Sequence, residues 1–346
     1  MNESDSERIA TVLENDGYKK ANSLEQADLI VVNACSVRQT AIDRIFGLLN
    51  NIKRLKKKNP KLRIVITGCI LKSDKRKFEE FLTPYRTCSG AEFDEILDIE
   101  KFLGKNYLSL KPKCINKFSA FVPIMTGCDN YCTYCVVPYT RGREKSRPAQ
   151  SIINEVANLI KEGYKEITLL GQNVNSYLPA GKAGKYGFAA LLKKINNISG
   201  DFIIKFLTNH PKDFSDELIN TIAKRKKVAK EIHLPIQSGD DDILKKMNRG
   251  YTVRQYKNLV KKIREKIPNV KLSTDVIVGF PDETNKQFEN TVKLFKEVNY
   301  DLAYINKYSP RVGTVAAKLK DNVSWQEKKR RWNILNEIVN KKEKPK

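Results

Sequence analysis

The sequence lacks the features of membrane-embedded and exported proteins. None of its apolar stretches approaches the roughly 20 residues that span a bilayer, so an integral membrane protein is not expected. The first residues, MNESDSERIA, are polar and acidic, without the basic start and apolar run of a signal peptide. These absences predict a cytoplasmic protein that does not associate with membranes.

Histidine is scarce, and acidic residues are few relative to basic ones. Only His210 and His233 occur, and no Ser/His/Asp arrangement for nucleophilic catalysis is evident. Lysine and arginine number 64 against 40 aspartates and glutamates, a formal net charge of +24. This excess favours a nucleic-acid partner, because each cation placed near a phosphate releases counterions. Alternatively, lysines in helical patterns such as NIKRLKKKNP form a solvated face.

The cysteines indicate metal or cluster ligation rather than disulfides, because their number is odd and a cytoplasmic protein is kept reduced. Cys128, Cys132 and Cys135 lie within eight positions, and the other four are dispersed. Three thiolates on one loop suit an iron–sulfur cluster with one iron open to a non-protein ligand. Structural zinc usually takes four ligands, and neither histidine is near this loop. The spacing therefore favours a cluster over zinc or coincidence.

The hydrophobic pattern predicts an α/β fold in two domains. In residues 1–100, helices alternate with apolar strands that end at Cys35 and Cys69, which predicts a parallel sheet. Residues 101–117 resemble a linker. Residues 118–346 repeat a strand–helix rhythm that predicts a partial barrel of six βα units and a C-terminal helix. The six strands are expected at residues 119–125, 166–172, 201–208, 231–237, 270–280 and 301–309.

The cysteine loop follows the first barrel strand, and active residues gather on the loops after such strands. This CxxxCxxC motif, with Tyr134 before its third cysteine, resembles the radical S-adenosylmethionine (SAM) superfamily. The segments VVNACSVRQTA, VITGC, HLPIQSGDDDILKKMNRGYT and TDVIVGFPDET resemble the methylthiotransferases within it. EITLLGQNVNSY and GCDNYCTYCVVPYTRGREKSRP are most similar to enzymes that methylthiolate N6-isopentenyladenosine beside the tRNA anticodon. The resemblance covers nearly the whole chain.

The resemblance implies two cofactors and a radical reaction. Cys128, Cys132 and Cys135 would hold a [4Fe-4S] cluster whose open iron binds SAM. Cys35 and Cys69 would be two ligands of an auxiliary [4Fe-4S] cluster, the proposed sulfur source; alternatively, they are small buried apolar residues. One SAM would methylate a cluster-derived sulfur, and another would provide a radical that removes hydrogen from the adenine carbon between the two ring nitrogens. That carbon–hydrogen bond is neither acidic nor electrophilic enough for ordinary acid–base catalysis.

The resemblance also implies which residues line the SAM and substrate cavity. Gly171, Gln172 and Asn173 would lie by SAM, with Gly171 letting the backbone approach its methionine end. The remaining candidates are weaker, and some of them alternatively belong to turns that merely close a barrel strand. The further candidates are Tyr134, Gln237, Ser238, Asp275 and Gly279.

The basic run after the cysteine loop predicts contact with RNA. Arg141, Arg143 and Arg147 stand where an anticodon loop would approach, and guanidinium groups bind phosphates and stack on bases. The alternative is a solvated surface loop. The implied partners are the tRNA anticodon loop and an electron donor such as flavodoxin or ferredoxin, and we expect a monomer.

Two departures from the family pattern concern the chain ends. The family's first auxiliary cysteine lies in a G-C-x-x-N motif, and this sequence begins as though inside it, with Asn2 as the asparagine. The family's small C-terminal β-barrel RNA-binding domain has no counterpart after Lys346. We expect a truncated or misassigned gene, or else a minimal enzyme that holds its auxiliary cluster poorly. Cys88 and Cys114 match no family position, although Cys88 is a candidate substitute ligand.

Two other functions are consistent with the sequence. The same chemistry can act on threonylcarbamoyladenosine in tRNA or on a ribosomal-protein aspartate, although those relatives usually differ at the LLGQNVN segment. A protein that binds RNA without catalysis and carries a cluster or zinc is the alternative from another class.

Overall fold

The computed structural model describes the chain except for residues 38, 87–93, 105–106, 113–115, 180–186 and 342–346. The chain divides into two compact units. Unit 1 comprises Met1–Ile115, Cys135–Gly142 and Arg311–Gly313. Unit 2 comprises Asn116–Tyr134, Arg143–Pro310 and Thr314–Lys346.

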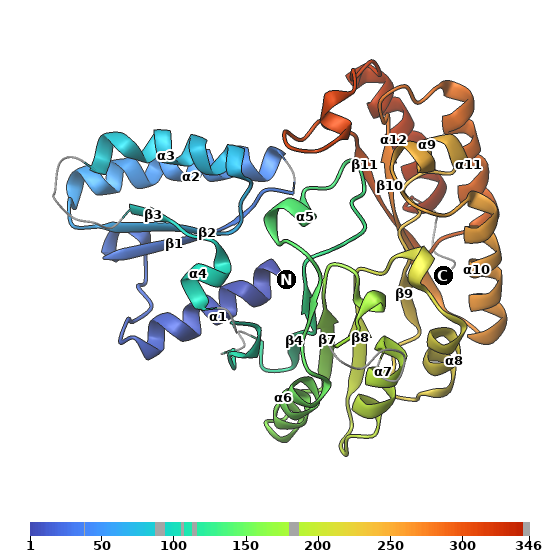
Figure 1. Cartoon of the computed structure of the whole chain (residues 1–346), viewed down its shortest axis with the longest axis horizontal. Helices are drawn as coiled ribbons and strands as arrows, with labels where there is room; N and C mark the ends of the chain where they lie inside the picture. The colour runs from blue at the N-terminus through green and yellow to red at the C-terminus, as the bar shows by residue number, and fades with distance from the viewer. Residues whose placement is uncertain (38, 87–93, 105–106, 113–115, 180–186, 342–346) are drawn as a thin grey trace. The chain divides into compact units, whose positions relative to one another are not determined.

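Unit 1 contains a parallel sheet with the strand order β1-β2-β3 (Figure 1). Apolar runs without period-2 alternation favour strands covered by helices, and the predicted parallel sheet is confirmed. The strands are β1 (Leu29–Cys35), β2 (Arg63–Cys69) and β3 (Asp94–Ile96). The helices are α1 (Asn2–Asn15), α2 (Gln39–Lys58), α3 (Lys72–Arg86), α4 (Ile99–Leu103) and α5 (Val137–Thr140).

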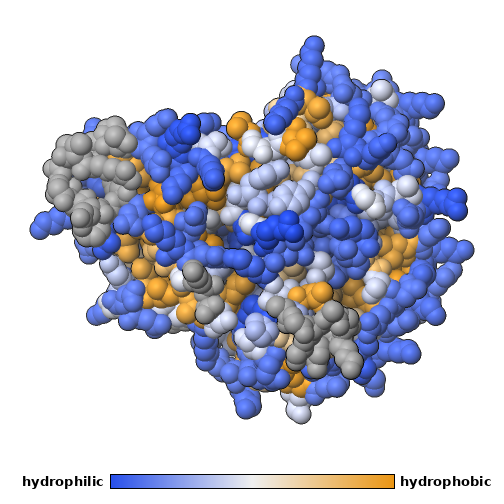
Figure 2. Space-filling view, in the orientation of Figure 1, coloured by the Kyte–Doolittle hydropathy of each residue, from blue (hydrophilic) through white to orange (hydrophobic). Residues whose placement is uncertain are grey.

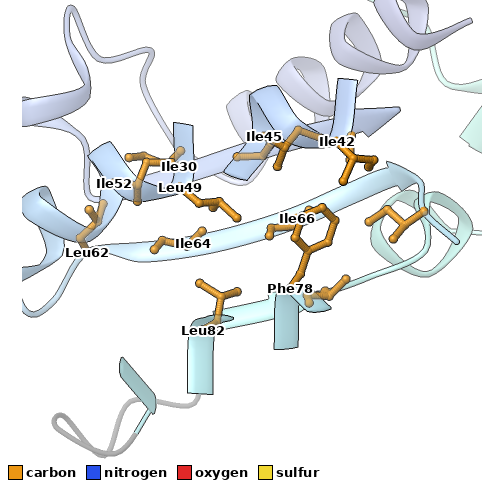
Figure 3. Packing of buried hydrophobic residues seen from close by; sticks show 14 of the residues in the cluster. Ile30, Ile42, Ile45, Leu49, Ile52, Leu62, Ile64, Ile66, Phe78 and Leu82 are labelled. Atoms are coloured by element: carbon orange, nitrogen blue, oxygen red, sulfur yellow. The ribbon is translucent and has the colours of Figure 1, made fainter. Parts of the chain in front are cut away.

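The core of unit 1 forms because α2 and α3 each present one apolar face. In α2 the buried residues recur at helical spacing, and Phe78 and Leu82 of α3 do the same. Figure 3 shows these side chains around Ile64 and Ile66 of β2. The buried residues of α2 are Ile42, Ile45, Leu49 and Ile52. This packing holds the sheet whose first two strands end at Cys35 and Cys69.

Part of the range 101–117, predicted to be a linker, is packed into unit 1. It contains the end of α4 and a 3-10 turn, Tyr107–Ser109. Tyr107 and Leu108 are buried in a cluster with Ile9 of α1. Tyr107 and Leu108 therefore belong to the core, because burying them removes apolar surface from water.

The described residues of unit 2 contain six parallel strands. They form sheets of order β4-β7-β8 and β11-β10-β9 (Figure 1), and a parallel bridge from Ile204 to Val228 joins β8 to the residues before β9. Each strand lies within the range predicted for it, and the α/β class is confirmed. The strands are β4 (Ser119–Pro123), β7 (Glu166–Leu170), β8 (Ile203–Phe206), β9 (Glu231–His233), β10 (Lys271–Val278) and β11 (Leu302–Lys307). A separate antiparallel pair consists of β5 (Met125–Thr126) and β6 (Lys145–Ser146).

Helices connect these strands, and several begin at sequence-encoded caps. Thr252 and Thr284 each form a capping box with a glutamine three residues later, which satisfies backbone donors at the helix start. The helices are α6 (Ala149–Lys161), α7 (Phe188–Asn196), α8 (Asp216–Lys224), α9 (Asp241–Lys246), α10 (Val253–Lys266), α11 (Asn285–Val298) and α12 (Trp325–Val339).

Helix α12 and the residue that follows it cover the outer edge of β11. The Asn340 amide donates to the carbonyl of Ala303 (2.9 Å) and accepts from its N–H (3.1 Å). Trp332 Nε1 donates to the carbonyl of Ile305 (2.9 Å). These contacts occupy backbone groups that an edge strand otherwise offers to another strand.

Polar surface is abundant in both units. Figure 2 shows hydrophilic side chains over much of the visible face, as expected from 64 lysines and arginines. In the part of the chain that the structure describes, no helix has the length and apolar character needed to cross a bilayer.

Gly68→Ala is expected to destabilise unit 1 more than Gly17→Ala. Both glycines have positive φ, and the left-handed conformation costs an L-residue about 1–2 kcal/mol. At Gly68 a Cβ atom would also lie 2.5 Å from the carbonyl oxygen of Ala34, whereas Gly17 faces open space. Urea unfolding should show a loss at Gly68 more than twice the loss at Gly17. Equal losses of unfolding free energy would show that the ends of β1 and β2 can move apart to accommodate the added methyl group.

Candidate functional site

The structure brings Cys35 and Cys69 together at the carboxyl end of the unit 1 sheet. They are register partners and the last residues of β1 and β2. The N–H of Ser36 donates to the carbonyl of Cys69 (2.8 Å), which holds the two strand ends together. Gly68 permits this approach through its φ of +104°. Two thiols therefore share one sheet edge, where α/β sheets usually place their sites.

Arg141 lies buried in unit 1 beside these cysteines. Its Nε donates to the sulfur of Cys69 (2.7 Å), and its Nη2 pairs with Asp5 (2.6 Å). The side chains of Arg141 and Asp5 are 4% and 0% exposed. Burial raises the pKa of the Cys69 thiol. Arg141 was predicted to contact RNA, but its guanidinium is turned into unit 1. There it supplies the counter-ion that the buried carboxylate of Asp5 needs.

Sequence reasoning missed a second buried arginine in unit 1. Arg311 Nε donates to the carbonyl of Ser36 (2.6 Å), and Nη1 donates to Gln39 Oε1 (2.7 Å). It also pairs with Asp74, which accepts from the hydroxyl of Ser36 (2.7 Å). Arg311 thus fixes the turn after Cys35. No local signal identifies it, because its partners are 237 to 275 positions away in sequence.

In unit 2, two cysteines of the CxxxCxxC loop receive hydrogen bonds at sulfur. Asn130 Nδ2 donates to Cys128 (3.5 Å), and Arg249 Nη1 donates to Cys132 (3.2 Å). Arg249 is 4% exposed and also donates to the Tyr251 hydroxyl (2.9 Å). Burial raises the pKa of the Cys128 thiol. Hydrogen bonds to the sulfurs help to set the reduction potential of an iron–sulfur cluster. Asn130 and Arg249 therefore belong to this candidate site together with the thiols.

The donor chemistry of the loop fits an iron–sulfur cluster. Cys128 and Cys132 lie in unit 2, and Cys135 begins the segment that belongs to unit 1. Across the described ranges, no three His, Cys, Asp or Glu side chains are already gathered as ligands of one metal ion.

Within the described residues, the loops after β7 and β8 carry buried side-chain polar atoms without hydrogen-bond partners. Gly171 accepts a bond from the Thr208 hydroxyl (2.7 Å), and a Cβ on Gly171 would lie 2.6 Å from the side chain of Met125. Asn173 Nδ2 donates to Asp213 (2.7 Å), and the amide oxygen of Asn173 has no hydrogen-bond partner among the described residues. Buried polar groups are rarely left unsatisfied, so these atoms fit a ligand here. The unpartnered atoms are Gln172 Oε1, Asn173 Oδ1, Asn209 Oδ1 and His210 Nε2.

The candidates after β9 and β10 make the contacts of tight turns. Gln237 has a φ of +71°, and its N–H donates to the carbonyl of Asp275 (2.9 Å). Ser238 is fully buried and accepts from the N–H of Asp240 (3.3 Å). Gly279 has a φ of +69° and abuts Lys328. These contacts show how the strand ends are held.

The two remaining arginines of the basic run differ in exposure. Arg147 is buried, pairs with Glu155 (2.6 Å) and donates to the carbonyl of Pro123 (2.6 Å). The side chain of Arg143 is 73% exposed and lies 3.0 Å from Asp129. Of the three predicted RNA contacts, only Arg143 offers its guanidinium to solvent. Its neighbours Arg141 and Arg147 are internal, where Arg141 neutralises the buried Asp5 and Arg147 pairs with the half-buried Glu155.

The structure assembles a Ser/His/Asp group that the sequence did not make evident. His233 Nδ1 lies 3.0 Å from Ser273 Oγ, and Nε2 lies 3.1 Å from Asp275 Oδ2. The ring of Tyr304 meets the imidazole edge-to-face at 5.8 Å. The contacts bring the three residues together, but they do not by themselves make a nucleophilic triad. The strand register that aligns these residues is fixed only by tertiary pairing.

Two other cysteines, Cys88 and Cys114, lie outside the described residues. In the described residues, the free cysteines are the two of unit 1's sheet and the three of the CxxxCxxC loop.

Comparisons with known proteins cover both units. A model of the radical SAM superfamily matches residues 122–295, and a model of an uncharacterised protein family, UPF0004, matches residues 1–87. A Clostridium botulinum (strain Langeland) protein named tRNA-2-methylthio-N(6)-dimethylallyladenosine synthase is 46% identical, over 98% of this chain and 79% of the relative. The Clostridium novyi and Clostridium perfringens proteins of that name are 44% and 43% identical, over 98% and 99% of this chain and 79% and 80% of theirs.

Solved structures show a similar fold at low sequence identity. The cobalamin-dependent SAM radical enzyme OxsB aligns with a TM-score of 0.61 and 13% identity, over 98% of this chain and 52% of that chain. The radical SAM methyltransferase TsrM from Kitasatospora setae aligns with a TM-score of 0.59 and 14% identity, over 91% of this chain and 72% of that chain. At these identities the likeness concerns the fold alone.

His210 is expected to make stability fall with acidification. Burial, with smaller contributions from Arg249 and Lys212, lowers the pKa of His210 from 6.5 to about 2. Below the unfolded pKa, the unfolded chain binds a proton that the folded chain does not. The free energy of unfolding should therefore drop by about 2 kcal/mol from pH 7.5 to pH 5 through this residue. His210→Asn should show a correspondingly smaller drop in urea unfolding; identical pH profiles would contradict the assignment.

Proposed function

The chain belongs to the radical SAM superfamily and, within it, to the tRNA-2-methylthio-N(6)-dimethylallyladenosine synthase family, and on this premise we propose its reaction and the residues that perform it. The chain methylthiolates N6-isopentenyladenosine beside the tRNA anticodon. The observation that carries this function is the identity with synthases over almost the whole chain. It favours this substrate over threonylcarbamoyladenosine and over a ribosomal-protein aspartate.

Cys128, Cys132 and Cys135 would hold the SAM-cleaving [4Fe-4S] cluster. The support is three thiols on one loop, with N–H donors aimed at two of the sulfurs. When bound, the cluster and SAM supply the radical that removes hydrogen from the adenine carbon between the two ring nitrogens. Asn130 and Arg249 would hold the sulfurs in place, and the positive charge of Arg249 would offset thiolate charge.

Gly171, Gln172 and Asn173 would bind SAM after β7. The support is two buried oxygens on adjacent residues that have no partner in the part of the chain the structure describes, beside a glycine whose Cβ position is already crowded. An amide oxygen accepts hydrogen bonds, so Gln172 and Asn173 suit the ammonium of the methionine moiety. We place Tyr134, Gln237, Ser238 and Asp275 in the same cavity.

Cys35 and Cys69 would contribute two thiolates to an auxiliary cluster. Their support is the shared sheet edge and the hydrogen bond from Arg141 to Cys69. A third thiolate in contact with them does not occur in the described residues. The auxiliary cluster therefore needs a further ligand.

Arg143 would contact the anticodon loop, while Arg141 and Arg147 act inside the protein. The net charge of +24 supports an RNA partner. A flavodoxin or ferredoxin as electron donor, a monomeric state and a cytoplasmic location complete the proposal. The proposed domains are residues 1–100 and 118–346, joined by residues 101–117.

Deleting the gene is expected to remove 2-methylthio-N6-isopentenyladenosine from tRNA and leave N6-isopentenyladenosine in its place. Mass spectrometry of tRNA nucleosides measures both. An unchanged level of the methylthio nucleoside would sink the proposed function. Complementation with the wild-type chain is the control.

Cys132→Ala is expected to abolish SAM cleavage, because the SAM-cleaving cluster loses one of its three ligands. After anaerobic reconstitution, iron content and 5′-deoxyadenosine are measured. Cys35→Ala is the matched control, since its thiol would belong to the other cluster; it should keep SAM cleavage and lose methylthiolation. A Cys132→Ala protein that still cleaves SAM would refute the ligand assignment.

Arg143→Ala is expected to weaken RNA binding. It should also make the slope of the logarithm of the binding constant against the logarithm of the salt concentration shallower by about one. The reason is the loss of one exposed cation near phosphate. Fluorescence anisotropy with an anticodon stem-loop at several salt concentrations measures both quantities. Arg254→Ala, an exposed arginine on α10, is the control. Equal slopes for the two variants would remove Arg143 from the interface.

A further inference from the structure

The Ser/His/Asp group lies on one face of the second sheet of unit 2. Along β10, buried residues alternate with half-buried ones, and Ser273 and Asp275 belong to the half-buried set. Side chains two apart in a strand point to the same face. His233 of β9 contacts both, and Tyr304 of β11 is the register partner of Asp275. Four polar or aromatic side chains from three strands therefore form one cluster, the β9–β11 cluster.

The β9–β11 cluster does not have the geometry of a hydrolytic triad. A serine nucleophile needs free N–H groups nearby to stabilise the oxyanion. Ser273 lies inside β10 and is paired with His233 on one side and Leu302 on the other. The backbone N–H groups beside Ser273 are directed at the neighbouring strands, as in any central parallel strand. Ser273 and Asp275 instead fix the orientation of the imidazole, since each bonds a different ring nitrogen.

The cluster presents groups that remain available to a ligand. Asp275 is 31% exposed at its side chain, and within the described residues its Oδ1 makes no hydrogen bond. Tyr304 is 53% exposed, although its ring is held edge-to-face by His233. Leu302, two residues earlier on the same strand, is 40% exposed. An acceptor oxygen, an open aromatic face and an apolar side chain thus share one surface.

We propose that the β9–β11 cluster binds an adenine ring, with the ring stacked on Tyr304 and its exocyclic N–H donated to Asp275. This proposal rests on the proposed function. Proteins recognise unpaired bases by stacking them on aromatic side chains and bonding their edges. Adenine fits because it is planar and carries an exocyclic N–H that a carboxylate accepts. His233 and Ser273 are positioning residues, because they act through Asp275 and Tyr304.

Two substrates of the reaction carry adenine, namely the modified nucleoside in tRNA and SAM. The test therefore compares the full-length wild-type chain with Tyr304→Leu and Asp275→Asn. Tyr18→Leu, an exposed tyrosine of unit 1, is the control. Two RNA probes are used: an anticodon stem-loop with N6-isopentenyladenosine, and the same stem-loop with an abasic site at that position. Equilibrium dialysis measures SAM affinity on the same proteins.

The wild type and Tyr18→Leu should bind the adenine-bearing loop roughly 5- to 150-fold more tightly than the abasic loop, the range that base stacking supplies. Tyr304→Leu and Asp275→Asn should lose most of this ratio if the ring belongs to tRNA. If it belongs to SAM, the variants should lose SAM affinity by a similar factor and keep the RNA ratio. Variants that match the wild type in both measurements overturn the proposal.

These binding readouts separate the site from the function. A wild-type chain that forms no methylthio product, but whose adenine discrimination depends on Tyr304, would refute the proposed reaction and keep the adenine site. Urea unfolding of each variant shows whether a lost affinity reflects a lost fold.

Discussion

Hydrogen-bonded pairing of parallel strands is the constraint on which the candidate sites depend. In unit 1 the register sets Cys35 against Cys69, so that two thiols end at one edge. In unit 2 the same pairing sets Ser273 against His233 and Asp275 against Tyr304. Parallel strands need long crossover connections, and these carry the helices that cover the outer faces. A shift of one residue in register would turn each of these side chains to the opposite face.

Buried guanidinium groups are the second recurring device. Arg141, Arg249 and Arg311 are each surrounded by specific acceptors, and two of them neutralise a buried carboxylate. Arg249 differs, because its described partners are a thiol, two tyrosine hydroxyls and a carbonyl. A buried cation without a carboxylate costs free energy unless an anion joins it. A thiolate or an anionic cluster at Cys132 would provide that anion.

Much of the fold could be predicted from the sequence, because the signals are local. The strands ending at Cys35 and Cys69 are continuous apolar runs, and the capping residue Thr284 marks its helix directly. The CxxxCxxC loop is likewise a local spacing. Its place after the first barrel strand follows from the order of elements.

The remaining features depend on contacts between distant residues. Arg141 and Asp5 are 136 positions apart, and nothing near Arg141 distinguishes it from the exposed Arg143. His233 and Asp275 are 42 positions apart and meet only through strand register.

The covering of β11 also affects how far the sheet can extend. A closed barrel forms when the last strand pairs with the first through backbone groups. Here the side chains of Asn340 and Trp332 already hold the backbone of Ala303 and Ile305. The side chains at the end of the chain thereby occupy the edge of β11 that a further strand would need for pairing. Within the described residues, the sheet that contains β11 therefore ends at this strand, and removing the cover would expose a row of backbone groups to pairing with another chain.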